Sequence, residues 1–487
     1  MTNYSLRYLV LGAILVAFIN TGASTDSPKN LPNIVFILAD DLGGMDLPAY
    51  GNSFNEAPNI SKLAEDGLLF TNAYSACPVC SPTRASIQSG QYPARVGIID
   101  FITGHWRPYE EVIVPRNHTQ YLPDKIVTIG EIMKQAGYKT GYFGKWHLGN
   151  KFEHHPLSQG YDEANVGQGY YNVKFIPERE KGSVKRLSEL LTDFGEEFIE
   201  KNRDNPFFLF IAHYDVHVQL DADKELIKKY LNKERKDRYP GNAVYAAMIE
   251  HLDRSVGRIN AKLLSSGLER KTLVIFFSDN GGLIARYDRI PLLAPRNLDI
   301  YEDNPLKYIA TSNAPLRAEK GTVYEGGIRV PLIIKWPGVV EPGKISDRVV
   351  TSVDFYPTFL EITKAAKPKG QILDGISLVP ELTGNNIATE RPVFWHYPVY
   401  HHAEPAGAVR LGDWKMIENL VKGNYELYNL KADISEAMDL SLLYPDKTEE
   451  MKTILKKWQA DVNAEFPVSN PDFNEEKRYI WGKHPDR

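Results

Sequence analysis

The sequence predicts an α/β fold in which a large, mostly parallel sheet is sandwiched between helices. Four apolar runs have the length and composition of strands buried on both faces, and segments with helical spacing lie between them. Strands that alternate with helices favour a parallel sheet, since each intervening helix returns the chain to the same edge. The four predicted strands span residues 33–39, 138–143, 206–212 and 272–278.

Two helices are predicted just before the second and the fourth of these strands. The first begins at Thr128, which can form a capping box with Glu131, and ends at Gly137. The second covers Ile249 to Leu263, where apolar residues recur at three- and four-residue spacing and give one apolar face. A third helix-like segment follows at 355–364.

The chain changes character after this third helix. Residues 367–370 have the composition of a linker. Short strand candidates follow at 393–395, 408–411 and 414–417, and an amphipathic helix follows at 448–462. A chain of 487 residues is also long enough for one large domain and a smaller one. We therefore expect a large domain over residues 25–370. A small C-terminal α+β subdomain, an antiparallel sheet with a helix, is expected over residues 371–487.

The N-terminus has the features of an export signal. Arg7 precedes an apolar run at 8–19, and small residues follow at 22–24. The run is shorter than the about 20 residues that a membrane-spanning helix needs. We expect a signal peptide over residues 1–24, an exported protein that is periplasmic or secreted, and no membrane span after cleavage. An uncleaved membrane anchor is the alternative interpretation.

The composition is that of an ordinary globular protein without an excess of basic residues. Hydrophobic residues make up 43% of the chain, charged residues make up 24%, and the formal net charge is −5. We expect no nucleic-acid partner, because a general nucleic-acid binder needs basic residues to neutralise phosphates. An anionic substrate is compatible with this charge, since a few cations in one pocket can outweigh the average surface.

Cys77 and Cys80 are the only two cysteines, which is too few for a disulfide framework or a four-thiolate zinc site. Cys80 begins a segment that places a thiol, the rigid Pro82 and the cation of Arg84 within five residues. That combination suits a site for an anionic ester, whereas a buried cysteine in a turn is the alternative. A disulfide between the two cysteines is not expected, because it would consume the reactive thiol.

Two of the predicted strands are followed directly by acidic and amide side chains. Asp40 and Asp41 come after the first strand, and Asp279 and Asn280 come after the fourth. Because parallel strands deliver ligands at their carboxyl ends, the two pairs are expected to meet in one crevice. Their oxygens are ligands that Ca²⁺ or Mg²⁺ prefers over zinc. Solvated turns are the alternative interpretation of each pair taken alone.

The segment at 80–90, Cys-x-Pro-x-Arg followed by a spacer and a glycine, resembles the signature of the type I, formylglycine-dependent sulfatases. These enzymes belong to the alkaline-phosphatase superfamily, so the resemblance implies an alkaline-phosphatase-like sheet. The likeness is strongest to bacterial enzymes that act on sulfated carbohydrates. Further blocks resemble family motifs in the family's order, at 32–41, 144–149, 278–282, 320–331 and 427–430, with Glu436 after the last.

The resemblance implies the cofactors of the site. Asp40, Asp41, Asp279 and Asn280 would bind one Ca²⁺ ion, which would also touch the side chain at Cys80. Cys80 would be converted to formylglycine (3-oxoalanine). The partner for that step would be a formylglycine-generating enzyme or an anaerobic sulfatase-maturating enzyme.

The resemblance also implies which residues handle the sulfate group. The hydrate of the converted Cys80 would be the nucleophile, with Asp279 as its base. Arg84 would orient the hydrate and neutralise charge. Lys145 and Lys320 would bind sulfate oxygens, a task that suits compact point charges.

Two histidines receive different roles from the same resemblance. His147 would take a proton from the remaining hydroxyl of the hydrate and so release sulfate. His217 would lie near the leaving alcohol and protonate it together with Lys320. The sequence around His217 departs from the family's usual Pro-His-x-Pro pattern, so His213 is an alternative for this role.

We therefore predict a sulfuric ester hydrolase that removes sulfate from a carbohydrate, for example an oligosaccharide of a marine polysaccharide such as ulvan or carrageenan. One alternative is a phosphomonoesterase or phosphonate hydrolase of the same superfamily. Another is a catalytically inactive carbohydrate-binding homologue. Residues near the strand ends that could contact a sulfated sugar are His105, Trp106, Arg107, Arg286 and Arg296, and a lattice of surface charges is the alternative interpretation of this set.

Some remaining residues match no family motif. The histidine pairs at 154–155 and 401–402 are interpreted as solvated residues or residues at the rim of the substrate site. Asn59 and Asn117 begin glycosylation sequons, which matter only in a eukaryotic secretory host.

Overall fold

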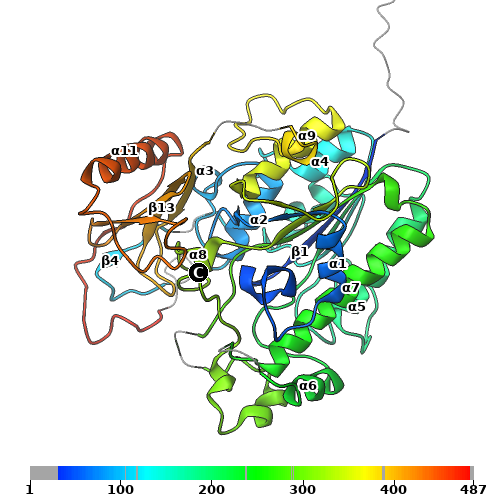
Figure 1. Ribbon diagram of the computed structural model, residues 1–487, viewed down its shortest axis with the longest axis horizontal. Coiled ribbons are helices and arrows are strands. Elements are labelled where there is room, and N and C mark those ends of the chain that lie inside the picture. The colour runs from blue at the N-terminus through cyan, green and yellow to red at the C-terminus, as the bar shows by residue number, and fades with distance from the viewer. Residues whose placement is uncertain are drawn as a thin grey trace, which may run out of the picture.

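An eight-stranded sheet forms the centre of the protein in the computed structural model (Figure 1). The structure describes residues 31–104, 106–116, 119–235, 239–286, 288, 290–385 and 390–482. The strand order is β10-β2-β9-β8-β1-β7-β5-β6, and β9 alone runs antiparallel to its neighbours. The predicted α/β class with a mostly parallel sheet is thus confirmed. The strands are β1 (Asn33–Ala39), β2 (Leu68–Phe70), β5 (Lys139–Gly144), β6 (Glu163–Val166), β7 (Phe207–Ala212), β8 (Thr272–Ser278), β9 (Leu332–Lys335) and β10 (Lys344–Ser346).

Helices cover both faces of the sheet, and the alternation of side chains along β1 shows how (Figure 1). Val35 and Ile37 face one helical layer, whereas Ile34 and Phe36 face the other. All four are fully buried, as expected for a strand covered on both faces. The first layer contains α1 (Pro58–Glu65), α5 (Leu187–Lys201), α6 (Lys224–Leu231) and α7 (Ala243–Ser265). The second contains α2 (Cys80–Ser89), α3 (Pro93–Val96), α4 (Ile129–Gln135), α9 (Phe355–Thr363) and α10 (Val379–Leu382).

The predicted helix signals are present in the structure. Thr128 caps α4, since its hydroxyl accepts from the backbone N–H of Glu131 at 3.2 Å. The Glu131 carboxylate in turn accepts from the backbone N–H of Thr128 at 2.7 Å, which completes the predicted capping box. Helix α7 is longer than predicted, because Asn242 caps it well before the first residue of the periodic pattern.

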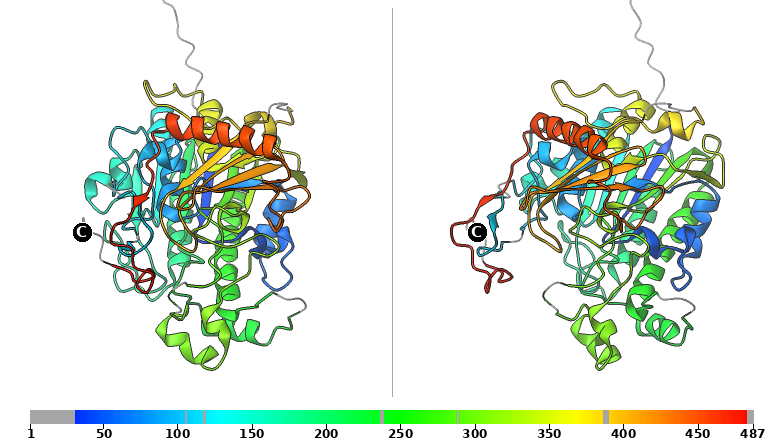
Figure 2. Two further views of the ribbon diagram at one scale, coloured as in Figure 1. Left: turned by 90° about the vertical axis from the view of Figure 1, so that its left-hand side faces the viewer. Right: turned by 60° about the vertical axis from the view of Figure 1, so that its left-hand side comes forward.

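A second, antiparallel sheet with the order β12-β13-β14-β15 follows the large one, and α11 covers one of its faces (Figure 2). Its three predicted strands are present and slightly longer than expected, and β15 adds a fourth. The elements are β12 (Val393–Tyr397), β13 (Ala406–Leu411), β14 (Trp414–Asn419), β15 (Tyr425–Asn429) and α11 (Pro445–Asp461). Short remaining elements are α8 (Glu325–Ile328), the pair β3 (Ala73–Tyr74) with β11 (Val350–Thr351), and the pair β4 (Val112–Ile113) with β16 (Val468–Ser469).

A buried ion cluster joins the small sheet to α8. Lys415 of β14 lies 2.9 Å from Glu325 of α8 and 2.8 Å from Glu436, and all three side chains are fully buried. The Glu436 carboxylate also accepts from the backbone N–H of Glu325 at 2.8 Å. Burial of unpaired charges is costly, so these three residues stabilise the junction only as a complete set.

Two predictions about processing concern other parts of the chain. The predicted signal peptide at 1–24 lies outside the described residues, and within the described part no helix has the length and apolar character to span a bilayer. At the first sequon, the amide of Asn59 donates to Asp253 at 2.7 Å and lies against Gly257 of α7. A glycan at Asn59 would therefore require this contact to open. Asn117 lies outside the described residues.

Candidate active site

The two predicted acidic pairs lie side by side at the carboxyl edge of the sheet. Strands β1 and β8 are neighbours in register, so Asp40 and Asp41 come out next to Asp279 and Asn280. The backbone N–H of Asp41 donates to Asp279 at 3.2 Å, and the Asn280 amide donates to Asp41 at 2.8 Å. All four side chains are buried. The crevice expected from a parallel sheet is therefore present, and these four residues form its floor.

Asp41 is held in an unusual backbone conformation. Its φ is 61°, in the left-handed region that non-glycine residues rarely adopt. The next residue, Leu42, is fixed by a hydrogen bond from its N–H to the Ser278 hydroxyl at 3.1 Å. Such strain costs of order 1–3 kcal/mol and concentrates at functional sites. The turn directs the Asp41 carboxylate toward Lys320 and His217.

Cys80 and Arg84 enter this crevice from α2. Cys80 is the first residue of the helix, and its Sγ lies 3.2 Å from Nδ1 of His147. Arg84 follows one turn later, and its guanidinium donates to Asp279 at 2.9 Å and to the backbone oxygen of Lys145 at 2.7 Å. Both cysteines are free thiols, in agreement with the expectation that Cys77 and Cys80 form no disulfide.

Two lysines meet the carboxylates of the crevice floor. Nζ of Lys145 lies 2.6 Å from Asp40, and Nζ of Lys320 lies 2.7 and 2.8 Å from the two oxygens of Asp41. Burial opposes ionisation of Asp40, but Lys145, His217 and Arg84 together hold its pKa below the usual value. Asp40 raises the pKa of Lys145 against the effect of burial. The lysines are thus cationic at neutral pH.

Asp279 differs from the other carboxylates. Burial and the charge of Asp40 raise its pKa well above the ordinary value, and the guanidinium of Arg84 only partly opposes this. The raised pKa favours the protonated form of Asp279, whereas the charges of Asp40 and Asp41 beside it are balanced by Lys145 and Lys320.

Two of the predicted histidines line the open side of the crevice. Burial lowers the pKa of His147 to about 3, with Lys145 and Arg84 adding to the effect. Burial also lowers the pKa of His217 to about 4, although Asp41 opposes the shift. Both rings are therefore neutral at pH 7, and each can accept a proton.

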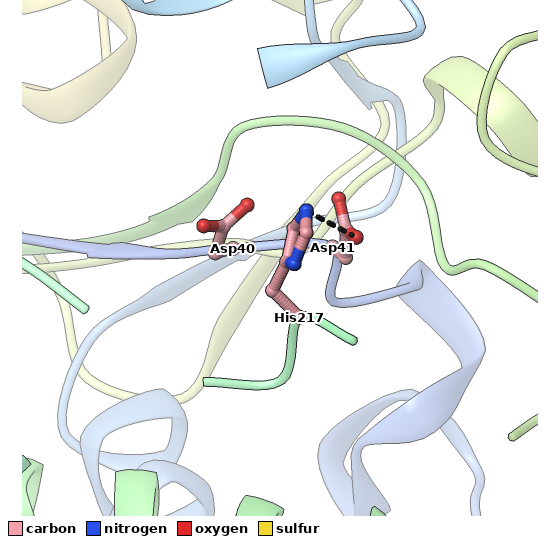
Figure 3. Close-up of side chains that lie close together, drawn as sticks. All are labelled: Asp40, Asp41 and His217. Carbon is pink, nitrogen blue, oxygen red and sulfur yellow. Dashed lines mark ion pairs between the residues drawn. The ribbon is translucent and has the colours of Figure 1, made fainter. Parts of the chain in front are cut away.

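The alternative histidine lies elsewhere. His213 is fully buried, its Nε2 lies 3.1 Å from the Ser255 hydroxyl of α7, and it does not line the crevice. His217 faces the acidic pair instead, with its Nε2 3.6 Å from Asp41 (Figure 3). Of the two candidates that the sequence left open, His217 is the one in contact with the site.

A compact group of potential metal ligands lies at the floor. One ligand atom from each of Asp40, Asp41 and His217 falls within 4.8 Å of the others, and Figure 3 shows the imidazole between the two carboxylates. Oδ1 of Asp40 and the amide oxygen of Asn280 are buried and have no hydrogen-bond partner. Buried oxygens without donors fit a hard divalent cation. This group differs from the predicted ligand set, because it includes His217 and leaves out Asp279, which is paired with Arg84.

A cavity of about 390 Å³, here called the catalytic cavity, opens above these groups. Of the predicted residues, Cys80, Lys145, His147, His217 and Lys320 line it. Several other lining residues could not be predicted, because they are apolar or uncharged polar positions on loops outside any motif. These are Phe101, Ile102, Thr103, Gln168, Tyr214, Val218 and Leu283.

The residues predicted to contact a sugar are distributed differently. Arg286 and the pair His401–His402 line the catalytic cavity. Arg296 is absent from the described lining, because its guanidinium pairs with Asp221 at 2.8 Å. Arg107 lines a neighbouring cavity, whereas His105 lies outside the described residues. His154 and His155 are buried away from the described lining, so the prediction that they are solvated was wrong.

Comparisons with known proteins agree with this geometry. A sequence model of the sulfatase family matches residues 32–365, and a model described as N-sulphoglucosamine sulphohydrolase, C-terminal, matches residues 318–465. A sulfatase of Formosa agariphila is 31% identical over 94% of each chain. N-acetylgalactosamine-6-sulfatase of Homo sapiens is 31% identical over 81% of this chain and 73% of its own.

Comparison with solved structures agrees with the family match. The crystal structure of Ps i-CgsB has a TM-score of 0.74 and 27% identity, covering 91% of this chain and 94% of its own. The phosphonate monoester hydrolase of Agrobacterium radiobacter, at 18% identity and a TM-score of 0.62, shares the fold. With its crevice of carboxylates and cations around Cys80, this chain belongs to the sulfatase family of the alkaline-phosphatase superfamily and is a sulfuric ester hydrolase.

Proposed function

We propose that the protein removes sulfate from a sulfated carbohydrate, with Cys80 converted to formylglycine and one Ca²⁺ ion bound at the floor of the catalytic cavity. The observation that carries the proposal is the position of Cys80. Its Sγ lies on the cavity wall, 3.2 Å from a neutral histidine, with two buried lysines lining the same cavity. A group attacking an anionic ester needs this combination of a nearby base and fixed cations.

The proposed calcium ligands are Asp40, Asp41, Asp279 and Asn280, the set that the sequence predicts. The unpaired oxygens of Asp40 and Asn280 support the assignment, because each lacks a donor in a buried site. His217 is a second-choice ligand, since hard cations prefer oxygen. When bound, the ion supplies positive charge that polarises sulfate oxygens and lowers the pKa of a nearby hydroxyl.

Two lysines are proposed to hold the sulfate group. Lys145 and Lys320 line the cavity and would each give a donor to a sulfate oxygen, while Arg84 holds the Asp279 carboxylate below. In the absence of substrate the two lysines bind Asp40 and Asp41. Sulfate binding would therefore redirect their ammonium groups from the floor toward the anionic sulfate in the cavity.

The histidines are proposed to move protons. His147 is neutral at pH 7 and contacts the side chain at position 80, so it can accept a proton from the nucleophile's remaining hydroxyl. His217 is also neutral, so the proton for the leaving alcohol would come from Lys320, which shares Asp41 with it. His217 would then orient that alcohol by a hydrogen bond.

The substrate class is proposed from the relatives and from the shape of the site. Ps i-CgsB has been crystallised in complex with k-i-k-neocarrahexaose, and other relatives are N-acetylgalactosamine-6-sulfatases. The cavity mixes cations with aromatic residues such as Phe101 and Tyr214, which suits a sulfated sugar ring. Sulfated galactose units, as in carrageenan oligosaccharides, are the first compounds to test, followed by ulvan oligosaccharides. Action on such polymers fits a protein that is exported to the periplasm or secreted.

Two measurements test the proposal. Mass spectrometry of the peptide that contains Cys80, from protein made with a maturating enzyme, should show the thiol replaced by an aldehyde oxygen. Released sulfate is then measured on a panel of compounds. The panel contains 4-nitrophenyl sulfate, sulfated galactose and N-acetylgalactosamine, disaccharides that link each sulfated residue to one uncharged sugar, and matched phosphate esters. Faster turnover of the phosphates, or an unmodified cysteine in active protein, would refute the proposal.

A further inference from the structure

The described part of the C-terminal tail, up to residue 482, packs against the segment that carries β4 and the loop around Trp106. Strand β16 pairs with β4, and Figure 2 shows the red tail running along the cyan segment that carries β4. Asn470 donates from its side chain to the backbone oxygens of Pro108 at 2.9 Å and Glu110 at 2.7 Å. The backbone N–H of Gly482 donates to Trp106 at 3.0 Å. These contacts fix the tail against the loop that follows the signature helix α2.

The tail and this loop enclose a second cavity of about 450 Å³, here called the outer cavity. Its size lies within the range of ordinary ligand sites. His401 and His402 line both the outer and the catalytic cavity, so the two cavities share a wall. The outer cavity is also lined by Arg107, Tyr400, Tyr479 and Trp481.

The shared wall is rigidly held. Nδ1 of His401 lies 2.6 Å from Nδ1 of His402, and Nε2 of His402 lies 2.9 Å from the backbone oxygen of Ala285. Arg107 donates to the backbone oxygen of His401 at 2.8 Å. His401 also lies against Gly321, the residue after Lys320. The wall between the two cavities thus contacts the residue that follows the lysine proposed to serve the leaving alcohol.

Aromatic rings form much of the outer cavity. The Arg107 guanidinium lies 4.4 Å from the ring centroid of Trp481 and 5.8 Å from that of Tyr400. Tyr479 is 71% exposed although it is aromatic and adjoins a cavity. An exposed ring of this kind contributes little to the core. It offers a flat apolar face on which the C–H groups of a sugar ring can pack, and a hydroxyl that can bond to the hydroxyls of the sugar.

The linings of the two cavities differ in their carboxylate content. The described lining of the catalytic cavity includes the cations Lys145, Arg286 and Lys320 and no carboxylate. The outer cavity has two arginines against three carboxylates. Both arginines, at 107 and 478, pair with one of those carboxylates, at 3.1 and 3.2 Å. The other two carboxylates pair with cations outside the lining. A second sulfate group would therefore meet no surplus positive charge in the outer cavity.

We infer that the outer cavity binds the sugar residue adjacent to the one that carries the reacting sulfate, and that this adjacent residue is uncharged. The inference rests on the proposed action on carbohydrates. It makes the preferred substrate at least a disaccharide, in which one sulfated ring occupies the catalytic cavity and a neutral ring lies between Tyr479 and Trp481.

The test compares Tyr479→Ala and Trp481→Ala with the wild type, each as the full-length, modified enzyme. From the panel, the disaccharide with one sulfated and one uncharged sugar that the wild type hydrolyses best is chosen. It is measured beside its own sulfated monosaccharide and 4-nitrophenyl sulfate. Loss of one aromatic contact should raise KM for the disaccharide about five- to tenfold and leave kcat unchanged. Values for the two smaller substrates should stay within about twofold of wild type, because they occupy the catalytic cavity alone.

Ile480→Ala is the matched control. Ile480 is 50% exposed, lies between the two aromatic residues in the sequence and does not line the outer cavity. Its replacement should leave KM and kcat for all three substrates unchanged. This result separates loss of the site from general disturbance of the tail. Circular dichroism of each variant checks that the fold is retained.

Three results would overturn the inference. The first is an unchanged KM for the disaccharide in both aromatic variants. The second is a wild-type kcat/KM that is no higher for the disaccharide than for its sulfated monosaccharide. The third is a higher kcat/KM when the adjacent sugar also carries sulfate. If the wild type hydrolyses 4-nitrophenyl sulfate but no sugar sulfate at all, the proposed carbohydrate function itself is wrong, and the inference falls with it.

Discussion

Replacing Gly321 by alanine tests how closely the catalytic cavity depends on the loop that carries Lys320. Gly321 has a φ of 79°, and its N–H donates to the backbone oxygen of Pro78 at 2.9 Å. An added Cβ would lie 2.0 Å from Nδ1 of His401, whereas real Cβ atoms essentially never come closer than 3.0 Å. Either the imidazole or the loop must therefore move by at least about 1 Å.

Two effects of the substitution can be estimated separately. The left-handed backbone costs an alanine about 1–2 kcal/mol of folding free energy. A displacement of about 1 Å near the reacting groups can lower the rate about a hundredfold. We therefore expect Gly321→Ala to fold with a modest loss of stability but to lose between about ten- and a hundredfold in kcat/KM on 4-nitrophenyl sulfate.

Gly338→Ala provides the matched control. Gly338 has a φ of 84°, but nothing lies within 4 Å of the position of an added Cβ. This variant should lose the same about 1–2 kcal/mol in urea unfolding and keep full activity. If both alanine variants retain wild-type kcat/KM, the contact between Gly321 and His401 does not position Lys320, and the reasoning fails.

Three further perturbations follow from buried groups. Lys415→Met should lower the free energy of unfolding by about 3–5 kcal/mol, because it leaves the buried Glu436 without its cation and leaves Glu325 with Arg329 alone, at 3.4 Å. The partly exposed Lys452→Met measures the background, and an equal small loss in urea melts would contradict the idea. Asp279→Ala should abolish calcium binding in titration calorimetry and reduce turnover at least about a hundredfold; full activity with calcium retained would remove Asp279 from the site. Burial lowers the pKa of His213 to about 3 in the folded protein. In the unfolded chain this histidine takes up a proton near its ordinary pKa of about 6.5, so the free energy of unfolding decreases as the pH falls below about 6.5. Between pH 7 and pH 5 the wild type should therefore lose about 2 kcal/mol more than His213→Gln, and parallel pH profiles of the two proteins would refute this origin.

Much of the site was predictable because it follows strands whose sequence pattern is unambiguous. β1 and β8 are apolar throughout, and their ends carry the two acidic pairs. Parallel pairing then places Asp40 and Asp279 together although 239 residues separate them. Shorter strands were missed for the opposite reason. β2 and β10 have three residues each, which is too few for any periodic pattern, and nothing local marks β9 as antiparallel.

The remaining differences arise from contacts between distant segments. The choice between His213 and His217 depends on how the chain turns after β7, where His213 is covered by α7. Arg296 was expected near a sugar, but Asp221 pairs with it instead. The outer cavity depends on the path of the tail to Trp481, which no composition or spacing in the sequence indicates.

The central place of β1 has a consequence for how the chain acquires its structure. β1 pairs with β7 and β8, whose first residues are Phe207 and Thr272, so the strand finds its partners only after some two hundred more residues have been made. At ordinary synthesis rates of about 5–20 residues per second this delay is roughly 10–40 s. During that interval the nascent chain exposes the apolar segment of β1, which chaperones can bind. Position 80, only 2% exposed once folding ends, is then still accessible to a modifying enzyme, so the proposed oxidation belongs to this early window.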